Sequence, residues 1–231
     1  MTIGRLLLAT LLLATGPALA RSNQAGSNQA GSNRSDPPQA TVEADWILAR
    51  IARPAPSRTG FVEIRGSKLL KQPLRISGEY RHPDANTLVR EVRAPYPETT
   101  TIRAGEAVIE RAGKSPRRVS LSRVPELAGI QASFGAMLAG DGERLRRHYT
   151  LDADGSRQDW RLVLAPKDAG LARRIRNIVL HGRGAELRCI ETVPAGEDDV
   201  QRTLLAGAAR DAAAVADATA LAALCDGAAA R

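Results

Sequence analysis

The sequence predicts a mainly β (α+β) fold in which an antiparallel sheet is covered by short α-helices. Between Phe61 and Thr101, apolar and polar residues alternate in three short runs that glycine and proline separate. Alternation at period two with such punctuation is typical of successive antiparallel strands. One amphipathic helix is expected on each side of the strand-rich stretch, and a sheet with one apolar face needs such a cover.

Residues 1–20 have the features of a cleaved signal peptide. Arg5 supplies the positive start, Leu6–Leu13 the apolar run, and Ala18-Leu19-Ala20 the small residues of a cleavage site. No cysteine lies near that site, so lipid attachment there is not expected. We therefore expect an exported, soluble mature protein. Residues 21–40 repeat the motif SNQAG, and this polar, glycine-containing composition predicts a disordered linker.

The elements of the folded part follow in order. A short helix is predicted over Thr41–Ala52, where Val42 and Trp46 fall along one side and Pro54 stops the helix. Strands then follow at short intervals, which favours an antiparallel meander. They are predicted over Gly60–Arg65, Leu74–Tyr80, Thr87–Val92, Thr99–Ala104, Ala107–Arg111 and Arg118–Leu121.

A second helix is predicted over Pro125–Gly140, and Glu143–His148 is expected to add another turn. Apolar residues recur in the helix at three- and four-residue steps, at Leu127, Ile130, Phe134, Met137 and Leu138. Strands resume over Trp160–Leu164, Arg176–Leu180, Ala185–Thr192 and Val200–Leu205. Residues 41–205 are thus predicted to form one domain, and the alanine-rich residues 206–231 a tail with a marginal helix.

Charge and cysteine content leave alternatives open. The formal net charge is +8 with only 3% aromatic residues, and the arginines are scattered. A solvated basic surface or attraction to acidic lipid head groups fits this pattern, and nucleic-acid binding does not. Cys189 and Cys225 either form a disulfide in an oxidising compartment or remain free thiols.

No catalytic constellation is present. The three histidines, His82, His148 and His181, have no metal-ligand spacing, and no serine lies in a nucleophile-elbow motif. Glu197-Asp198-Asp199 is expected to be a solvated turn rather than a cation site. We predict neither enzyme activity, nor a metal, nor a cofactor. The apolar strand faces admit two interpretations, a fully packed core or a partly closed sheet with a ligand cavity under a helical lid.

The order of short motifs over residues 55–205 resembles the LolA-like family, the periplasmic carriers of outer-membrane lipoproteins. The motifs are Phe61-x-Glu63-x-Arg65, Leu70-x-x-Pro73-Leu74, Ser77-Gly78, Pro95-x-Pro97-Glu98, the helix Pro125–Leu138, Trp160-x-Leu162-x-Leu164-x-Pro166-x-Asp168 with Leu171, Ile178-x-Leu180-x-Gly182 and Ile190-Glu191. The resemblance implies a strongly curved antiparallel sheet, an incomplete barrel, whose open side short helices close.

The resemblance further implies a periplasmic monomer without enzymatic activity that shields acyl chains in a hydrophobic cavity. A donor transporter in the inner membrane and an acceptor at the outer membrane would be its partners. The residues expected to line the cavity or its lid are Phe61, Leu74, Ile76, Tyr80, Leu88, Leu127, Ile130, Phe134, Leu138, Trp160, Leu162 and Leu164. We predict that Phe134→Ala changes the affinity for acyl probes with only a modest loss of stability.

The chain departs from the family pattern where lipoprotein carriers have an arginine before a proline that latches the lid. Here His82 precedes Pro83, so Arg81 and His82 are the latch candidates. The low aromatic content and the lack of the expected glycine in Glu197-Asp198-Asp199 also differ. These departures indicate a diverged relative whose cargo is a lipoprotein or another acylated molecule, such as a glycolipid or polyene lipid. The alternative is a non-carrier envelope protein that uses the same fold as a binding or scaffolding module.

Overall fold

The structure is a computed structural model that describes residues 41–65, 74–121, 136–137, 139–196, 199–215 and 218–225. The predicted signal peptide and linker, within residues 1–40, lie outside these ranges.

The helices are α1 (Ala44–Ile51), α3 (Gly142–His148), α4 (Ala169–Ala172), α5 (Ala206–Asp211), the 3₁₀ turn η2 (Ala212–Ala214) and α6 (Ala218–Ala223). The strands are β1 (Ser57–Arg65), β2 (Leu74–Asp84), β3 (Thr87–Ala94), β4 (Glu98–Arg103), β5 (Glu106–Arg111), β6 (Arg117–Ser120), β7 (Tyr149–Gly155), β8 (Trp160–Pro166), β9 (Ile175–Arg183), β10 (Glu186–Pro194) and β11 (Gln201–Leu205).

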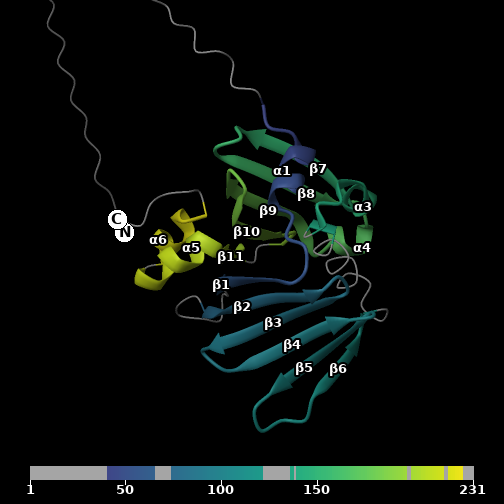
Figure 1. Ribbon diagram of the computed structural model, residues 1–231, viewed down its shortest axis with the longest axis vertical. Helices are drawn as coiled ribbons and strands as arrows, with labels where there is room; N and C mark the ends of the chain where they lie inside the picture. The colour runs from purple at the N-terminus through teal and green to yellow at the C-terminus, as the bar shows by residue number, and fades with distance from the viewer. Residues whose placement is uncertain are drawn as a thin grey trace, which may run out of the picture. The chain divides into compact units, whose positions relative to one another are not determined.

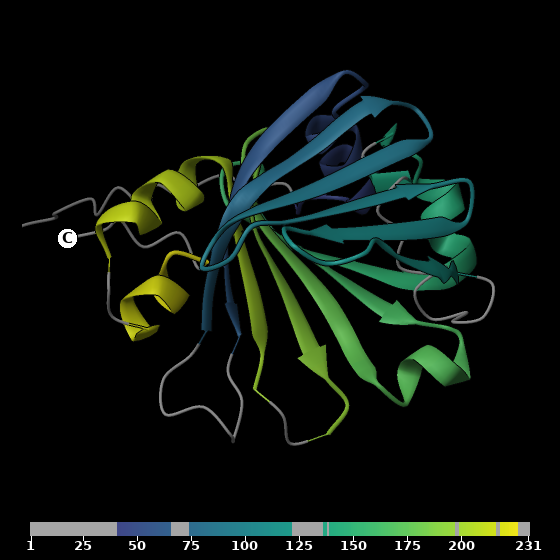
Figure 2. The ribbon, with the colours of Figure 1, turned by 90° about the horizontal axis from the view of Figure 1, so that it is seen from below.

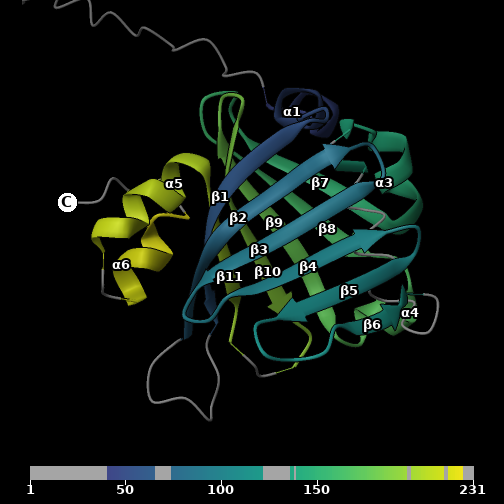
Figure 3. The same cartoon turned by 60° about the horizontal axis from the view of Figure 1, so that its bottom comes forward.

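The strands of the described residues all belong to one antiparallel sheet, which they do not close into a barrel. The strand order is β6-β5-β4-β3-β2-β1-β11-β10-β9-β8-β7, so two sequence-local meanders meet at the β1–β11 ladder (Figure 1). The sheet bends there, and the half from β2 to β5 faces the half from β7 to β10 (Figures 2 and 3). The predicted mainly β class and the curved, incompletely closed sheet are therefore confirmed.

Strand β7 and helix α4 are elements that the residue pattern did not predict. In β7, Tyr149, Leu151 and Ala153 alternate with Asp152 and Asp154, and Tyr149 is fully buried. The alternation is regular, but it follows directly on α3 and includes two aspartates, which are rare in strands. Several predicted strands are also longer in the structure. β2, for example, continues past Tyr80 to Asp84, because pairing with β3 extends across the turn between them.

The two faces of the sheet have different covers. We call the face that carries Phe61, Ile76 and Leu162 the inner face, and the opposite face, which carries Val62 and Leu204, the outer face. Helix α1 covers the inner face over β7, β8 and β10 and buries Ile47, Leu48 and Ile51 there, in a cluster that also contains Leu162 and Tyr149. This half of the inner face is therefore a packed core.

The alanine-rich segment covers the outer face beside β1, β10 and β11. Ala208, Ala212, Leu221 and Leu224 form a buried cluster with Val62, Ile64 and Leu204, and Figure 3 shows α5 and α6 outside the bend of the sheet. The predicted marginal helix is thus a packed helical cover. Small alanine side chains suit this position because they let the helix backbone approach the sheet closely.

Two links fasten that cover to the sheet. Cys189 of β10 and Cys225 form a disulfide, which decides between the two alternatives left open by the sequence. The Arg75 guanidinium on β2 donates hydrogen bonds of 2.6 Å to the backbone oxygens of Ala212 and Val215. These two carbonyls lie at the end of the α5–η2 segment, where the Ala212 oxygen also accepts from the Val215 N–H at 3.1 Å.

Gly182 on β9 gives space to Trp160 on β8. A Cβ atom at Gly182 would lie 2.1 Å from Cζ2 of Trp160 and 2.5 Å from the backbone oxygen of Glu186. The indole is fixed in place because its Nε1 donates to the Gly184 oxygen at 3.0 Å and its ring is buried. Neither neighbour can move away freely, so this position requires glycine.

We expect Gly182→Ala to lower the free energy of unfolding by about 2 kcal/mol, the typical effect of overpacking a core. Thermal unfolding followed by circular dichroism measures this loss. Gly196→Ala is the matched control, because a Cβ there meets nothing within 4 Å. An equal change in both variants would show that the effect comes from the glycine backbone and not from the Trp160 contact.

Candidate functional site

The inner face brings together the described residues that the sequence predicts for the cavity, in two separate groups. Phe61 and Ile76 form a buried cluster with Val92 and Leu205, and Leu74 and Tyr80 pack against it. Trp160, Leu162 and Leu164 lie in the core under α1. Leu127, Ile130, Phe134 and Leu138 lie outside the described residues, whereas their predicted neighbour Met137 is helical and buried. Ligand binding by these residues stays a prediction.

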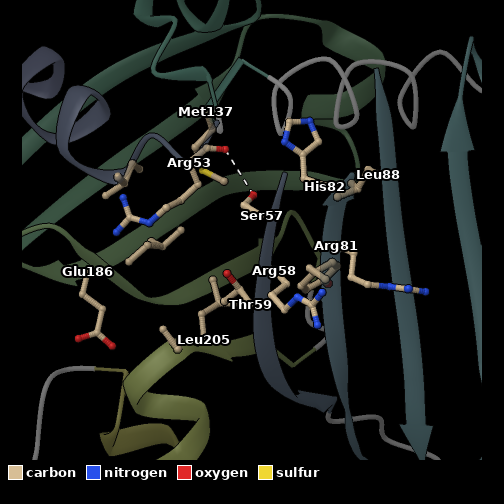
Figure 4. A pocket seen from close by; sticks show the side chains of 14 residues that line it. Arg53, Ser57, Arg58, Thr59, Arg81, His82, Leu88, Met137, Glu186 and Leu205 are labelled. Carbon is tan, nitrogen blue, oxygen red and sulfur yellow. Dashed lines mark hydrogen bonds between the residues drawn. The ribbon is translucent and has the colours of Figure 1, made fainter. Parts of the chain in front are cut away.

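A small cavity of about 80 Å³ lies between these two groups (Figure 4). Tyr80 and Leu88 of β2 and β3 line it together with Ile51 of α1, Met137 and Leu205. Polar side chains at its rim include Arg53, Ser57 and Glu186. The cavity therefore joins the end of helix α1 to the half of the inner face that α1 does not cover.

The two latch candidates point in opposite directions. Figure 4 shows the two side chains extending in different directions, Arg81 away from the cavity, and strand alternation places His82 on the inner face with Tyr80. Arg81 forms an ion pair of 3.0 Å with Glu91 on the outer face. The Nδ1 atom of His82 is buried and has no hydrogen-bond partner among the described residues. Of the two, only His82 is oriented for a latch, and the latch itself stays a prediction.

A buried carboxylate on the inner face was not predicted. Glu63 of β1 has only 2% of its side chain exposed, and it pairs with Arg65 and, at 2.8 Å, with Nη2 of Arg90 on β3. A buried charge is tolerated only when it is paired and hydrogen-bonded. The sequence contained one signal for this arrangement. Glu63 follows Phe61 by two residues, so alternation along the strand places both side chains on the same face.

Aromatic rings surround the Arg90 guanidinium. Its carbon lies 4.9 Å from the centre of the Phe61 ring, and the Tyr80 ring lies 4.7 Å from that ring. Arg90 also hydrogen bonds to the Tyr80 side chain, while burial raises the pKa of the Tyr80 hydroxyl above its ordinary value. Tyr80 is therefore uncharged at neutral pH, and Arg90 is held by an aromatic pair and a carboxylate.

The described residues show no arrangement of histidine, cysteine, aspartate or glutamate that could hold a metal ion. Of the predicted acidic cluster, Glu197 and Asp198 lie outside the described ranges. None of the helices in the described ranges is long and apolar enough to span a bilayer. The chemistry of the inner face is thus apolar contact, together with the charges around Glu63 and Arg90.

Solved structures and a family model match this chain. A LolA superfamily protein from Nitrosomonas europaea, NE2245, has a similar structure with 10% sequence identity and a TM-score of 0.38, and the match covers 71% of this chain and 92% of that one. The complex of MucA and MucB from Pseudomonas aeruginosa also matches, with 16% identity and a TM-score of 0.37 over 71% of this chain and 56% of that one. No curated protein matches the sequence. The model of the family described as "outer membrane lipoprotein carrier protein LolA-like" matches residues 36–228, and the chain therefore belongs to that family.

Proposed function

We propose that this protein is a periplasmic carrier that shields the acyl chains of a lipoprotein or another acylated lipid during transfer toward the outer membrane. It receives the cargo from an inner-membrane transporter and delivers it to an outer-membrane acceptor. The observation that carries the proposal is the open, curved sheet, whose inner face holds an apolar cluster and a cavity beside helix α1. Membership in the carrier family supports the same function.

An apolar face that is covered only in part suits the transport of acyl chains through water. Each methylene group of an acyl chain gains about 0.8 kcal/mol when it leaves water, so a lipid needs a shielded site to cross an aqueous space. Apolar contact is non-directional, which allows the cargo to slide in and out. A carrier of this kind needs no catalytic residue, and its specificity comes from the shape and charge of the cavity.

Cargo entry requires a rearrangement. The cavity of about 80 Å³ is much smaller than the ~300–1,000 Å³ typical of ligand pockets. The carrier therefore opens before it loads, by displacing Met137 from the cavity. His82, which lines the same cavity as Met137, latches the closed state in this proposal.

The test is lipid binding by the mature protein. Native mass spectrometry after purification without detergent should show bound acyl species, and the protein should take up a fluorescent fatty acid. Leu88→Gln, at the cavity, should weaken uptake about tenfold because it places an amide against the acyl chain. Val89→Gln, on the next residue and thus the opposite face of β3, is the matched control. No bound lipid and no uptake by the native protein would overturn the proposal.

The small cavity also favours a second candidate, a binding or scaffolding module of the cell envelope that uses the same fold without carrying lipid. A scaffold would retain a stable protein partner in affinity capture from the periplasm and would bind no fatty acid. A carrier would show the reverse pattern, since it meets its donor and acceptor only transiently.

A further inference from the structure

Five charged side chains form a continuous row across the inner face of β1, β3, β4 and β5. We call this row the charge ladder, and its members in spatial order are Arg65, Glu63, Arg90, Glu98 and Arg111. Arg90 lies at the centre, with Nη2 at 2.8 Å from Glu63 and Nη1 at 3.9 Å from Glu98. Arg111 closes the row through a 2.5 Å contact with Glu98. Strand register places these residues on the same face as Phe61 and Val92.

The charge ladder carries one surplus positive charge, because three guanidinium groups face two carboxylates. Its carboxylates are the more buried members, with 2% and 11% of their side chains exposed, against 47% for Arg65 and 46% for Arg111. The surface that the charge ladder presents to a ligand is therefore mainly guanidinium. Arginine is also the residue best suited to recognise carboxylate or phosphate groups.

Arg90 retains capacity for a further partner. Its side chain is 19% exposed, and the 3.9 Å separation from Glu98 lies beyond hydrogen-bond length, so Nη1 makes only a long ion pair there. The neighbouring Phe61 and Tyr80 hold the guanidinium in position without neutralising it. A pre-positioned cation at an apolar surface interacts strongly with an anion because little water screens the pair.

The charge ladder and the cavity are connected through Tyr80. Tyr80 contacts Arg90 on one side and lines the cavity on the other. A ligand that extends from the cavity across the Phe61 cluster therefore reaches Arg90 with its end. Such a ligand needs an apolar chain for the cavity and the cluster and an anionic group for the charge ladder.

We propose that the charge ladder, with Arg90 at its centre, is the head-group subsite of this carrier and selects acylated molecules that bear a carboxylate or phosphate. This inference rests on the proposed carrier function and adds to it the class of cargo. Neutral acyl molecules of the same chain length bind less well because they offer no anionic partner to the Arg90 guanidinium. Cationic amphiphiles are excluded by the same charge.

The test compares two probes with the same fluorescent 16-carbon chain, one ending in a carboxylate and the other in its methyl ester. We expect the native protein to bind the carboxylate about tenfold more tightly, the effect of one charge-assisted hydrogen bond. The preference should shrink as the salt concentration rises. Equal affinity for both probes would overturn the head-group subsite and leave the carrier function standing, whereas binding of neither probe would overturn both.

A double variant tests whether the preference for the carboxylate probe depends on Arg90. Glu63→Gln combined with Arg90→Gln removes the Arg90 guanidinium without leaving a buried Glu63 carboxylate that has lost this partner, and it should abolish the preference for the carboxylate probe over the ester. Arg93→Gln is the matched control, since Arg93 lies on the outer face of the same strand with Glu79 and Glu91. Loss of the preference in the control would overturn the assignment to Arg90.

Inorganic phosphate at millimolar concentration should not displace the carboxylate probe, and displacement would indicate a free-anion site instead.

Discussion

Replacing Cys189 and Cys225 together with serine is expected to lower the free energy of unfolding by about 4 kcal/mol. The disulfide closes a loop of 36 residues, and constraining a loop of this length in the unfolded chain accounts for the magnitude. The loss should also loosen α6, because Cys225 is buried in the cluster that holds this helix on the outer face. Urea unfolding of the oxidised protein and the variant measures the difference.

Hydrogen exchange separates the two parts of this prediction. Amides of α6 should lose nearly all their protection through local opening in the serine variant, whereas amides of β7–β9 should lose only the protection that the lower global free energy of unfolding removes. Arg75→Met is the comparison, since it removes the other link to the same segment, at Ala212 and Val215, and leaves the disulfide intact. An unchanged free energy of unfolding in the serine variant would contradict a stabilising role for the bond.

Arg90→Met is expected to lower the free energy of unfolding by about 3 kcal/mol. It leaves the buried Glu63 carboxylate with the half-exposed Arg65 as its only ion-pair partner among the described residues, and removing one partner of a buried ion pair is strongly destabilising. Glu63→Gln in the same background should restore part of the loss, because it removes the charge that Arg90 compensated. Chemical unfolding of the two single variants and the double variant gives their coupling.

The outer face of the same strand supplies the control for this prediction. Arg93 pairs with Glu79 and Glu91, but 59% of its side chain is exposed. Exposed ion pairs contribute little, so Arg93→Met should change stability by less than about 1 kcal/mol. If both arginine variants lost the same stability, the Glu63–Arg90 pair would behave as a surface ion pair and not as a buried one.

Period-two alternation was sufficient to predict most of the sheet. It located β1 to β6 and β8 to β11 because their apolar positions recur regularly between glycine and proline residues. It failed at β7, where aspartates occupy the outer positions and no turn residue separates the strand from α3. The alternation also could not show which strands pair, and the β1–β11 ladder, between distant segments, is visible only in the structure.

The candidate site could be predicted only in its apolar part. Phe61 and Ile76 were identified as inward residues because alternation assigns faces, and the structure places them in one buried cluster. Glu63 and Arg90 occupy inward positions too, yet a charged residue in a strand is normally solvated, and nothing local in the sequence shows that the two meet. The sequence also did not predict that the alanine-rich segment packs on the sheet. Its side chains are only weakly hydrophobic, and they are buried because Val62 and Leu204 of the outer face lie against them.

The β1–β11 junction has a consequence for the order of folding. Each meander is built from neighbouring strands, so its pairs can form early with short loop closures. Joining the meanders requires contact between Phe61 and Leu205. All the other strands of both meanders lie between these two residues in the sequence. Such long-range pairing is slow, and until it occurs β1 is an unpaired edge with its apolar residues exposed, which is a template for aggregation. We therefore expect this chain to need protection by a chaperone between synthesis of β1 and docking of β11.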